Sequence, residues 1–498
     1  MKPKDQNSKV NSVNRKNAFF SFLFPIQPHF MDSKEGRFEN KDAEYDSLVN
    51  IIKGFFTQYS GAIILIATLS LLISGLISFL YLQPELEILH DNRLNSVWGT
   101  VFIITSLSLL SFKLLFFLFI LVNYFKYKAV KAVAPNLLPS CTIIVPAYNE
   151  GELVWKTLKS LAASEYPADK MQIISIDDGS KDDTWEWMKK AKSELGDRVE
   201  ILQQPKNMGK RHALYRAFNM GIGEVFITVD SDSIVNPDTL KNLVSPFVEN
   251  KNCGAVAGNV RVLNNKKAII PKMLNVSFAF SFEFIRSAQS NLGTVLCTPG
   301  ALAAYRREAV MGCLNDWINQ SFFGKPTDIG EDRAMTNMIL KQGYDVKFQS
   351  NAHVLTNIPE NYNNLQKMYT RWERSNVREN IMMSRFAFKN FRKGSKLGSR
   401  FLLLNQWVRV LTAIPATILM LIFISIHPLL FITTSFVSIL IFSSIPAFFY
   451  AKKHDISECL WAYAYSMFYA FGLFWITPYA IATANKRGWL TRGLAQKK

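Results

Sequence analysis

Two pairs of neighbouring carboxylates are the residues of this sequence best suited to chemistry. Asp230 and Asp232 stand two positions apart after an apolar, strand-like stretch, where they could share a divalent cation and the diphosphate that it neutralises. Glu331 and Asp332 open a helical stretch, where one of them could accept the proton of an attacking hydroxyl. A solvated turn and a simple acidic helix start are the plainer interpretations of the two pairs.

Residues that could hold a nucleotide follow two other strand-like stretches. Pro146, Tyr148 and Glu150 offer an aromatic face and polar groups suited to a nucleobase. Asp177 and Asp178 could accept hydrogen bonds from a base imide or from ribose hydroxyls. Each group alone also fits ordinary turn chemistry. Because ligands of open parallel sheets bind at the carboxyl ends of the strands, the groups together predict a nucleotide site.

Cations, a glycine and an indole complete the candidate site. Lys210 and Arg211 begin a helical stretch, and a helix N-terminus that carries two cations suits phosphate. Gly300 precedes another strand-like stretch and allows a ligand to approach the backbone closely. Arg371 adjoins Trp372, which places a fixed cation beside a ring that can stack on a ligand.

Strand-like and helical stretches alternate through the middle of the chain. This alternation predicts an α/β domain with a mostly parallel, Rossmann-like sheet and helices on both faces. Residues 273–291 and 377–400 are amphipathic, which predicts helices in the membrane interface, with ordinary domain packing as the alternative. The strand-like stretches are residues 142–147, 172–176, 199–202, 225–229 and 302–305, and the helical ones include 150–163, 210–220 and 331–340.

Apolar segments flank this domain on both sides. The chain of 498 residues is 49% hydrophobic and 19% charged, with 38 phenylalanines and a net charge of +18, which is less charged than soluble domains usually are. The basic residues flank apolar segments and do not form one stripe with interleaved aromatics, so membrane lipid is the expected partner and nucleic acid is not. Five segments are long enough to span: 61–82, 101–125, 401–426, 428–450 and 459–484.

The distribution of lysine and arginine predicts how the chain crosses the membrane. Lys126, Lys128 and Lys131 follow the second span, so the N-terminus and the central domain are expected in the cytoplasm. Three C-terminal spans would then leave the basic tail outside. Either one of them is a hairpin or re-entrant piece, or a span begins in the preceding amphipathic helix. Lys113 lies in the middle of the second span, where it either faces a cavity or partner or snorkels to the interface.

These features divide the chain into four regions. Residues 1–58 form a basic cytoplasmic tail, and residues 59–126 form two transmembrane helices. Residues 127–388 form the cytoplasmic α/β domain with its interfacial helices. Residues 389–498 form an interfacial helix, the C-terminal spans and a basic tail. The catalytic domain is therefore expected to be inserted between transmembrane helices of a plasma or inner membrane.

In this order, the motifs resemble those of the family 2 glycosyltransferases with a GT-A fold, specifically the processive membrane synthases. The resemblance covers about residues 60–490 and is to the hyaluronan synthases and the chito-oligosaccharide synthases. It rests on Val295-Leu296-Cys297-Thr298-Pro299-Gly300, Tyr305-Arg306-Arg307-Glu308, Trp317-Ile318-Asn319-Gln320-Ser321-Phe322, Ile329-Gly330-Glu331-Asp332-Arg333, Arg371-Trp372-Glu373-Arg374-Ser375 and Arg378-Glu379.

The resemblance implies a role for each matching position. The uridine of a UDP-sugar donor would be held by Tyr148, Glu150, Asp177 and Asp178, and the diphosphate by Lys210 and Arg211. Mg²⁺ or Mn²⁺ would be held by Asp230 and Asp232. The catalytic set would be Asp332 as the base with Glu331, Arg371 facing the leaving diphosphate, and Trp372 stacking on the growing polysaccharide acceptor. Pro146, Cys297, Gly300 and Arg333 complete the expected substrate-binding set.

Two departures from the family pattern leave the substrate open. The processivity motif is Gln-x-x-Arg-Trp, but Met368 stands three positions before Arg371, and Gln366 comes two residues too early to replace the glutamine. Met368 therefore leaves product length open, and Glu331 is nearer to the chitin-type enzymes than to the hyaluronan type. The oligomeric state is not indicated.

The resulting hypothesis is an inverting, metal-dependent transferase that polymerises UDP-GlcNAc, alone or with UDP-glucuronate, into an exported β-linked polysaccharide such as hyaluronan. A chitin-like or mannuronan-like polymer and a non-processive transfer to a lipid-linked acceptor are the alternatives. A non-catalytic scaffold is disfavoured because Asp230, Asp232 and Asp332 are all present.

Overall fold

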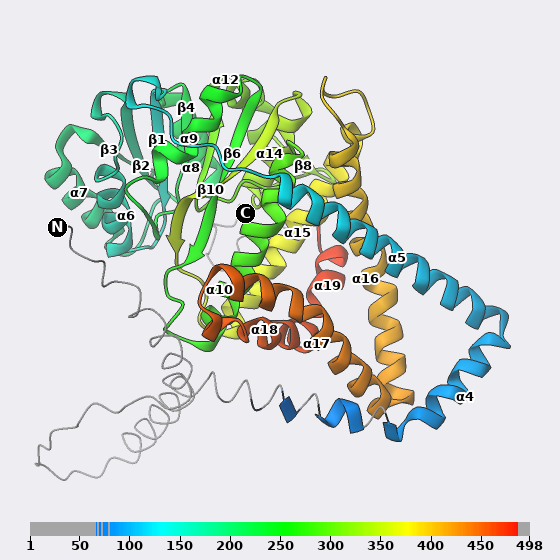
Figure 1. Cartoon of the computed structure of the whole chain (residues 1–498). Coiled ribbons are helices and arrows are strands. Elements are labelled where there is room, and N and C mark those ends of the chain that lie inside the picture. The colour runs from blue at the N-terminus through cyan, green and yellow to red at the C-terminus, as the bar shows by residue number, and fades with distance from the viewer. Residues whose placement is uncertain (1–65, 67–68, 71–72, 78–79, 487–498) are drawn as a thin grey trace, which may run out of the picture. The chain divides into compact units, whose positions relative to one another are not determined.

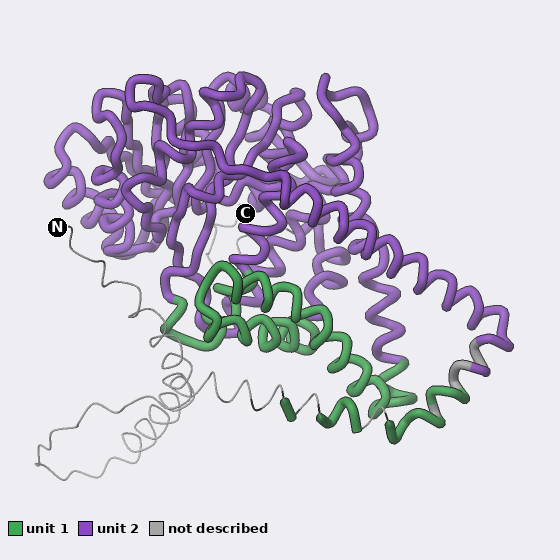
Figure 2. The backbone as a smooth tube through the Cα atoms, in the orientation of Figure 1, with its two compact units in different colours: residues 1–89, 265–277, 423–472 green, residues 90–264, 278–422, 473–498 purple. Residues whose placement is uncertain are grey.

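The computed structural model describes residues 66, 69–70, 73–77 and 80–486. The predicted N-terminal tail, half of the first predicted span and the basic tail beyond residue 486 lie outside the described residues. The chain divides into two units, and the smaller one consists of residues 1–89, 265–277 and 423–472 (Figure 2). The larger unit consists of residues 90–264, 278–422 and 473–498 and holds the sheet.

An eight-stranded, mostly parallel sheet forms the core of the larger unit (Figure 1). Its order is β3-β2-β1-β4-β7-β6-β10-β5, and only β7 and β5 run antiparallel to their neighbours. The sequence of β1 is an unbroken run of buried residues, as expected for a strand covered on both faces. The strands are β1 (Cys141–Ala147), β2 (Met171–Asp177), β3 (Val199–Gln203), β4 (Val225–Thr228), β5 (Ser233–Val235), β6 (Cys253–Val262), β7 (Ala303–Arg306) and β10 (Asp345–Thr356), with a separate hairpin of β8 (Ser321–Phe322) and β9 (Lys325–Pro326).

The strand predictions at residues 142–147, 172–176, 199–202, 225–229 and 302–305 are confirmed, and so is the predicted fold class. The helix predicted over residues 210–220 matches α8 at both ends. The helices of this domain are α6 (Glu152–Ala162), α7 (Thr184–Leu195), α8 (Lys210–Met220), α9 (Thr239–Glu249), α11 (Ser287–Asn291), α12 (Arg307–Met311), α13 (Leu314–Ile318), α14 (Glu331–Lys341) and α15 (Tyr362–Ala387). Short 3₁₀ turns are η1 (Pro135–Leu137), η2 (Ala168–Lys170) and η3 (Gly196–Arg198).

Both predicted amphipathic stretches differ in detail from a single helix. The first comprises most of α10 (Ile269–Ala279), then the π-helical segment η4 (Phe280–Arg286), then α11. The prediction of one helix over residues 377–400 is wrong, because α15 ends at Ala387 and α16 (Leu397–Ile426) begins ten residues later.

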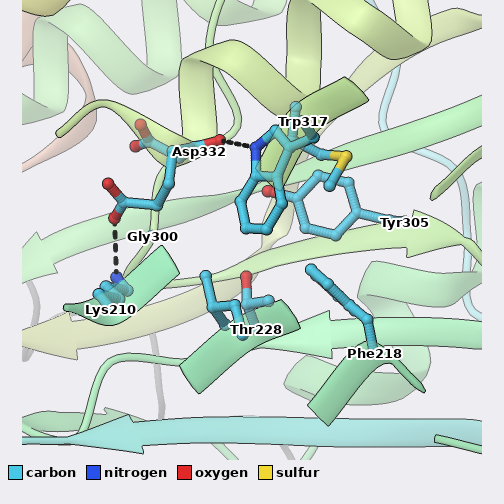
Figure 3. A pocket seen from close by; sticks show the side chains of 10 residues that line it. Lys210, Phe218, Thr228, Gly300, Tyr305, Trp317 and Asp332 are labelled. Atoms are coloured by element: carbon cyan, nitrogen blue, oxygen red, sulfur yellow. Dashed lines mark hydrogen bonds and ion pairs between the residues drawn. The ribbon is translucent and has the colours of Figure 1, made fainter. Parts of the chain in front are cut away.

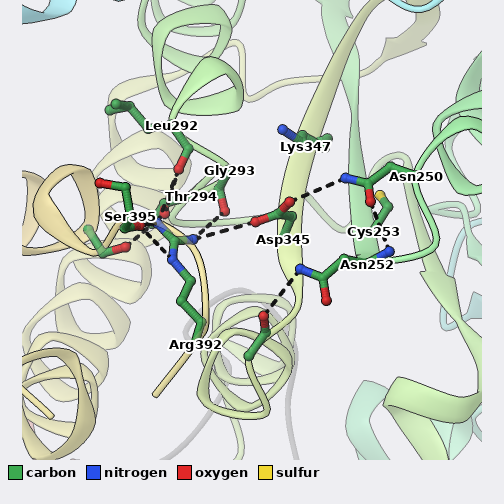
Figure 4. Close-up of polar contacts among 12 residues, drawn as sticks. Asn250, Asn252, Cys253, Leu292, Gly293, Thr294, Asp345, Lys347, Arg392 and Ser395 are labelled. Carbon is green, nitrogen blue, oxygen red and sulfur yellow. Dashed lines mark hydrogen bonds and ion pairs between the residues drawn. The ribbon is translucent and has the colours of Figure 1, made fainter. Parts of the chain in front are cut away.

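The break between α15 and α16 is stabilised by contacts from distant parts of the sequence (Figure 4). The buried Arg392 guanidinium donates to the carbonyls of Leu292 and Gly293 at 3.2 and 3.1 Å and also to the carbonyl of Ser395. It lies 3.7 Å from the Asp345 carboxylate. These acceptors satisfy the guanidinium only where the connector leaves the helical path, so tertiary contacts outweigh the local helical pattern.

Three described helices are long and apolar enough to cross a membrane: α5 (Val97–Lys126), α16 and α17 (Pro428–Lys453). They correspond to three of the five predicted spans. The last predicted span, residues 459–484, is bent by 47° between the segment that ends with α18 (Trp461–Gly472) and α19 (Ile476–Ala482). A broken span and a re-entrant piece both fit this bend, so both alternatives for the C-terminal spans stay open. The remaining elements are α4 (Gln83–Leu94) and η5 (Ile456–Glu458).

The smaller unit contains its own polar contacts. The Tyr450 hydroxyl of α17 donates to the Glu458 carboxylate at 2.7 Å and accepts from the Asn275 amide of α10 at 3.1 Å. These contacts join α10 to α17 and η5 within that unit.

Candidate active site

The predicted carboxylates and the predicted lysine meet beside the carboxyl end of β4. Lys210 is the first residue of α8, and its ammonium forms an ion pair with Asp230, two residues beyond β4. The Glu331 carboxylate lies 3.6 Å from the same ammonium. Burial acts to lower the pKa of Lys210, but the charges of Asp230 and Glu331 outweigh it and raise this pKa above its ordinary value. Lys210 is therefore a permanent cation between two acids from distant parts of the chain.

A small cavity adjoins this charged group (Figure 3). It has room for about one water molecule. Lys210, Gly300 and Asp332 lie on its polar side, and Phe218, Tyr305 and Trp317 form an aromatic side. The Trp317 indole donates to the Glu331 carbonyl at 2.9 Å, so the aromatic side also fixes the start of α14. The lining residues are Lys210, Leu214, Phe218, Thr228, Gly300, Tyr305, Trp317, Glu331, Asp332 and Met335.

Asp332 has the environment of a proton acceptor. It lies in the first turn of α14, where its carboxylate accepts from its neighbour Arg333's backbone N–H at 2.7 Å and from the Cys297 thiol at 3.6 Å. Burial and the charge of Glu331 raise the pKa of Asp332, while Lys210 and the Arg371 guanidinium act in the opposite direction. A carboxylate with a raised pKa is a stronger base, which suits general-base chemistry.

Two glycines permit the close packing of this site. Gly300 lies against the ion pair, and a Cβ added there would lie 2.6 Å from Lys210 Nζ and 3.5 Å from Asp230 Oδ1. Gly330 precedes α14 with a φ of 77°, and a Cβ there would lie 1.9 Å from Ser375 Oγ. A glycine is therefore required at position 330, because the backbone there is left-handed and α15 approaches it closely.

Asp177 and Asp178 bind the protein's own loops in this structure. Asp177, fully buried, accepts from the Ser180 backbone and hydroxyl and from the Gln203 amide. Asp178 accepts from the Gln204 amide and from the backbone N–H groups of residues 208 and 209, each at 2.8 Å. The second set orders the loop that leads directly into Lys210, so Asp178 shapes the phosphate side of the site.

The other predicted nucleotide residues lie on the same edge of the sheet. Pro146 is a buried residue of β1, and the Tyr148 ring is 8% exposed. The backbone N–H of Glu150 donates to the Thr184 hydroxyl at 2.8 Å, which joins this loop to the start of α7. The structure thus brings the ends of β1 and β2 together as predicted. Uridine binding remains a prediction.

Two predicted ligand contacts are buried in the interior instead. Arg211 donates to the Trp317 carbonyl at 2.6 Å and to the Gln320 side chain at 3.1 Å. Arg333 donates to Asn376 and Asn380 of α15 at 2.9 and 2.8 Å. Neither side chain lines the cavity, so the structure does not place them with Lys210 and Asp332. Each follows a cavity residue directly, and consecutive residues of a helix point in directions about 100° apart.

The Arg371-Trp372 pair and Met368 lie on α15. Trp372 is 38% exposed, and its ring packs against the rings of Phe278 and Tyr369 with centroids 6.3 and 5.5 Å apart. The charge of Arg371 acts on Asp332. Met368 is buried, so the position expected to hold the motif glutamine is part of the packing of α15.

The fit of Asp230 and Asp232 to a divalent cation is partial. Two carboxylates are hard oxygen ligands of the kind that Mg²⁺ and Mn²⁺ prefer. Asp232 accepts from the Thr356 hydroxyl at 3.2 Å, and Asp230 is paired with Lys210. Within the described part of the chain, no group of three or more His, Cys, Asp or Glu residues is arranged to hold a metal. A cation would therefore need ligands from the substrate.

Two features of the site were not predicted from the sequence. Trp317 is part of the aromatic side of the cavity and donates to the Glu331 carbonyl, which fixes the start of α14. Arg286 was not singled out, although its charge acts on both Cys297 and Asp332. A π-helical segment leaves no distinctive periodicity in sequence, so only the fold could have revealed Arg286.

The sheet has a GT-A-like, mostly parallel arrangement, and comparisons with known proteins show what the chain is similar to. Residues 142–313 match the family described as glycosyl transferase family 2. It is 31% identical over 253 residues to an N-acetylglucosaminyltransferase of Rhizobium leguminosarum bv. viciae, covering 51% of this chain and 59% of that protein. It is 32% identical over 252 residues to a hyaluronan synthase of Streptococcus pyogenes, covering 50% and 59%.

The match thus spans about three-fifths of the length of these relatives. Among solved structures, the chain is similar to the mannosyltransferase PcManGT from Pyrobaculum calidifontis in complex with GDP-Man and Mn²⁺. The TM-score is 0.49 at 20% identity, with 73% of this chain and 98% of that chain covered.

Proposed function

We propose that this protein is a membrane-embedded, inverting glycosyltransferase that polymerises UDP-sugars into a β-linked polysaccharide at the cytoplasmic face and exports it. UDP-GlcNAc, alone or with UDP-glucuronate, is the proposed donor. The observation that carries the proposal is the position of Asp332, partly buried beside Cys297 and on the same cavity as Lys210 of the Lys210–Asp230 ion pair. A proton acceptor thereby lies next to a group that can bind a leaving diphosphate.

The proposed reaction is a single displacement. The acceptor hydroxyl oxygen forms a bond to the anomeric carbon as its proton passes to Asp332. The bond from that carbon to the diphosphate oxygen breaks, and the diphosphate retains the electron pair. Attack from the opposite face converts an α-linked donor into a β-linked product, so no carboxylate nucleophile is required.

Electrostatics supply the other part of catalysis. The Lys210 ammonium can move from Asp230 to a phosphate oxygen without leaving the site, because both are anionic acceptors. A divalent cation, when bound at Asp230 and Asp232, would neutralise further charge on the diphosphate. Gly300 leaves the space above Lys210 Nζ free of a side chain, which allows the phosphates to approach.

Trp372 is the proposed contact for the acceptor sugar. Its partly exposed indole can stack on a sugar ring. The helices α5, α16 and α17 are each long and apolar enough to cross a membrane, and the proposed export requires a protein-lined path because a polar chain cannot cross lipid unaided. The cytoplasmic placement of the domain rests on the lysines after α5.

A direct test uses the protein purified in detergent with radiolabelled UDP-sugars, singly and in pairs, with Mg²⁺, Mn²⁺ or EDTA. The product is sized on a gel. Asp332→Asn tests the base, and Asp316→Asn, which changes an exposed aspartate of α13 in the same way, serves as the matched control. High-mass product that is lost in Asp332→Asn but not in Asp316→Asn supports the proposal. UDP release without polymer from every donor would contradict polymerisation.

Transfer of one sugar to a lipid-linked acceptor is the second candidate, and Met368 favours it. The buried Met368 replaces the glutamine of the processivity motif. Product length distinguishes the two functions: a short or lipid-extractable product supports single transfer. A longer product from Met368→Gln than from the natural chain would show that this position limits length.

A further inference from the structure

A chain of three buried hydroxyls connects two residues that line the cavity, Tyr305 and Asp332 (Figure 3). The Tyr305 hydroxyl lies 2.9 Å from the Thr298 hydroxyl, and Thr298 Oγ1 lies 2.8 Å from Thr336 Oγ1. The Thr336 hydroxyl donates to the Asp332 carbonyl at 2.8 Å. Thr298 and Thr336 are fully buried, and Tyr305 is nearly so. The chain therefore links the aromatic side of the cavity to the backbone of the proposed base.

The number of protons on these groups determines the direction of the chain. A hydroxyl has one proton to donate, and Thr336 gives its proton to the Asp332 carbonyl. In the contact between Thr336 and Thr298, the donor must then be Thr298. Thr298 has in turn no proton left, so the Tyr305 phenol donates to it. Burial raises the pKa of Tyr305, which keeps this phenol protonated.

Thr336 Oγ1 also accepts a hydrogen bond from a backbone donor. The Thr298 N–H donates to this oxygen at 3.1 Å, in addition to the Thr298 hydroxyl. The Thr336 hydroxyl thus donates one hydrogen bond and accepts two, which is the full capacity of a hydroxyl. Two of these three bonds come from a residue 38 positions away in the sequence, so they are tertiary contacts.

A bond from a threonine hydroxyl to the carbonyl four residues earlier is common in helices and carries no inference alone. Thr105 of α5 and Thr433 of α17 make the same bond at 2.8 and 2.9 Å. Thr336 differs because its oxygen also receives two donors from a second segment of the chain. Its hydroxyl therefore fastens that segment to the first turn of α14.

The fastened segment, residues 297–300, carries two residues of the site. The Cys297 thiol contacts the Asp332 carboxylate at 3.6 Å. Gly300 lies so close to Lys210 that an added Cβ would be 2.6 Å from the ammonium nitrogen. The segment thus contacts the proposed base and adjoins the cation that is proposed to bind the leaving diphosphate. The spacing of these two groups depends on how the segment is held against α14.

We propose that Thr336 is a positioning residue for the transfer reaction, because its hydroxyl holds Asp332 at a fixed spacing from segment 297–300 and so from Lys210. The inference rests on the proposed glycosyltransferase function and adds to it a residue that does not line the cavity. Displacing a reacting group by about 1 Å can lower a rate by about 100-fold. A buried hydroxyl chain in which every proton has an acceptor is suited to preventing such a displacement.

The test compares variants that preserve the shape of the side chain. Thr336→Val replaces the hydroxyl by a methyl group, and Thr336→Ser keeps the hydroxyl. Thr142→Val is the matched control, since Thr142 is fully buried and its hydroxyl donates to Gln172 at 2.7 Å and accepts from the Gly223 N–H at 2.9 Å. Thr142 lies at the amino end of β1, away from the carboxyl ends of the strands. Tyr305→Phe, which removes only the first donor of the chain, is a milder fourth variant.

Initial rates give kcat and the donor KM, and thermal midpoints give stability. Thr336→Val should lower kcat by about 10- to 100-fold with little change in the donor KM, because Lys210 keeps its own ion pair. Thr336→Ser should retain most of kcat, and Tyr305→Phe should lose less than Thr336→Val. Thr142→Val should lose a similar amount of thermal stability and keep its kcat. Equal kcat in the two valine variants would overturn the inference. If Thr336→Val does not fold, an unchanged kcat in Tyr305→Phe would overturn it.

A second measurement does not depend on sugar transfer. The alkylation rate of the partly buried Cys297 by iodoacetamide, followed by mass spectrometry, reports how firmly segment 297–300 is held. Thr336→Val should raise this rate several-fold, whereas Thr336→Ser and Thr142→Val should leave it unchanged. An unchanged rate in Thr336→Val would contradict the inference whether or not the natural chain transfers sugar. Absence of transfer by the natural chain, together with the expected alkylation rates, would contradict the proposed function alone.

Discussion

The cavity and the interface between α14 and α15 are built from adjacent residues, but their charged side chains have different kinds of partner. In the cavity, Lys210 is paired with Asp230 and lies near Glu331, so charged groups there face other charged groups. At the interface, Arg333 is held by the amides of Asn376 and Asn380. Amides cannot move away in exchange for a ligand without leaving buried donors and acceptors unsatisfied.

The two α8 cations show the same division. Lys210 faces the cavity, and its neighbour Arg211 donates into a buried network. In that network the Gln320 side chain accepts a hydrogen bond from Arg211 and donates one to Glu379 at 2.8 Å. Asn337 donates to the same carboxylate at 2.8 Å. The cavity lysine is thus held between charges, whereas Arg211 and Arg333 donate to neutral carbonyl and amide oxygens that stabilise the fold. Four predictions test this division.

The largest expected effect is on catalysis. Asp332→Asn should lower the transfer rate by about 10²–10⁴-fold, because the amide cannot accept the acceptor proton. Burial raises the pKa of Asp332, so its ionisation destabilises the fold as the pH rises through that pKa. At neutral pH the variant should therefore have a thermal midpoint at least as high as that of the natural chain. A lower midpoint would show that Asp332 is a structural residue like Arg333.

The next effect concerns the close approach of α15 to the start of α14. Gly330→Ala should destabilise the protein by roughly 2–4 kcal/mol, through the left-handed backbone and the overlap with Ser375 Oγ. The thermal midpoint in detergent is the measurement. Adding Ser375→Gly should restore the part due to overlap but not the part due to φ. If Ser375→Gly restores nothing, the packing is not limiting.

A smaller loss of stability is expected at the interface. Arg333→Ala should destabilise the protein by about 1–3 kcal/mol, because the partly buried Asn376 and the buried Asn380 lose their donor. The matched surface change Arg307→Ala should stay within about 0.5 kcal/mol. Thermal midpoints compare the two. Loss of donor binding at an unchanged midpoint would instead support the predicted role of Arg333 at the substrate.

The smallest effect is on the pH dependence of transfer. Because the pKa of Asp332 is raised, the acid limb of the rate profile should lie at higher pH than for an ordinary aspartate. The Glu331 charge contributes to this rise, so Glu331→Gln should move the limb to lower pH. Initial rates at saturating donor from pH 4 to 8 provide the measurement. A limb that does not move would mean that another group titrates.

Much of the fold was predictable because its signals are local. The apolar runs at β1, β2 and β4 and the start of α8 at Lys210 are visible in a few consecutive residues. The connector after Ala387 was not predictable, since it depends on Arg392 reaching carbonyls a hundred residues away. The π-helical segment η4 was missed because it leaves no distinctive periodicity in the sequence.

The candidate site was predictable in part. The sequence alone determined which residue types could do the chemistry, because acids after strands and cations at a helix start are patterns of spacing. It also determined the apolar spans, because length and hydropathy suffice for them. Only the tertiary structure decided which neighbour faces the cavity: Lys210 and Asp332 do, and Arg211 and Arg333 do not. The physical reason is that burial and hydrogen-bond partners come from distant segments, and these partners determine whether a charge is available to a ligand.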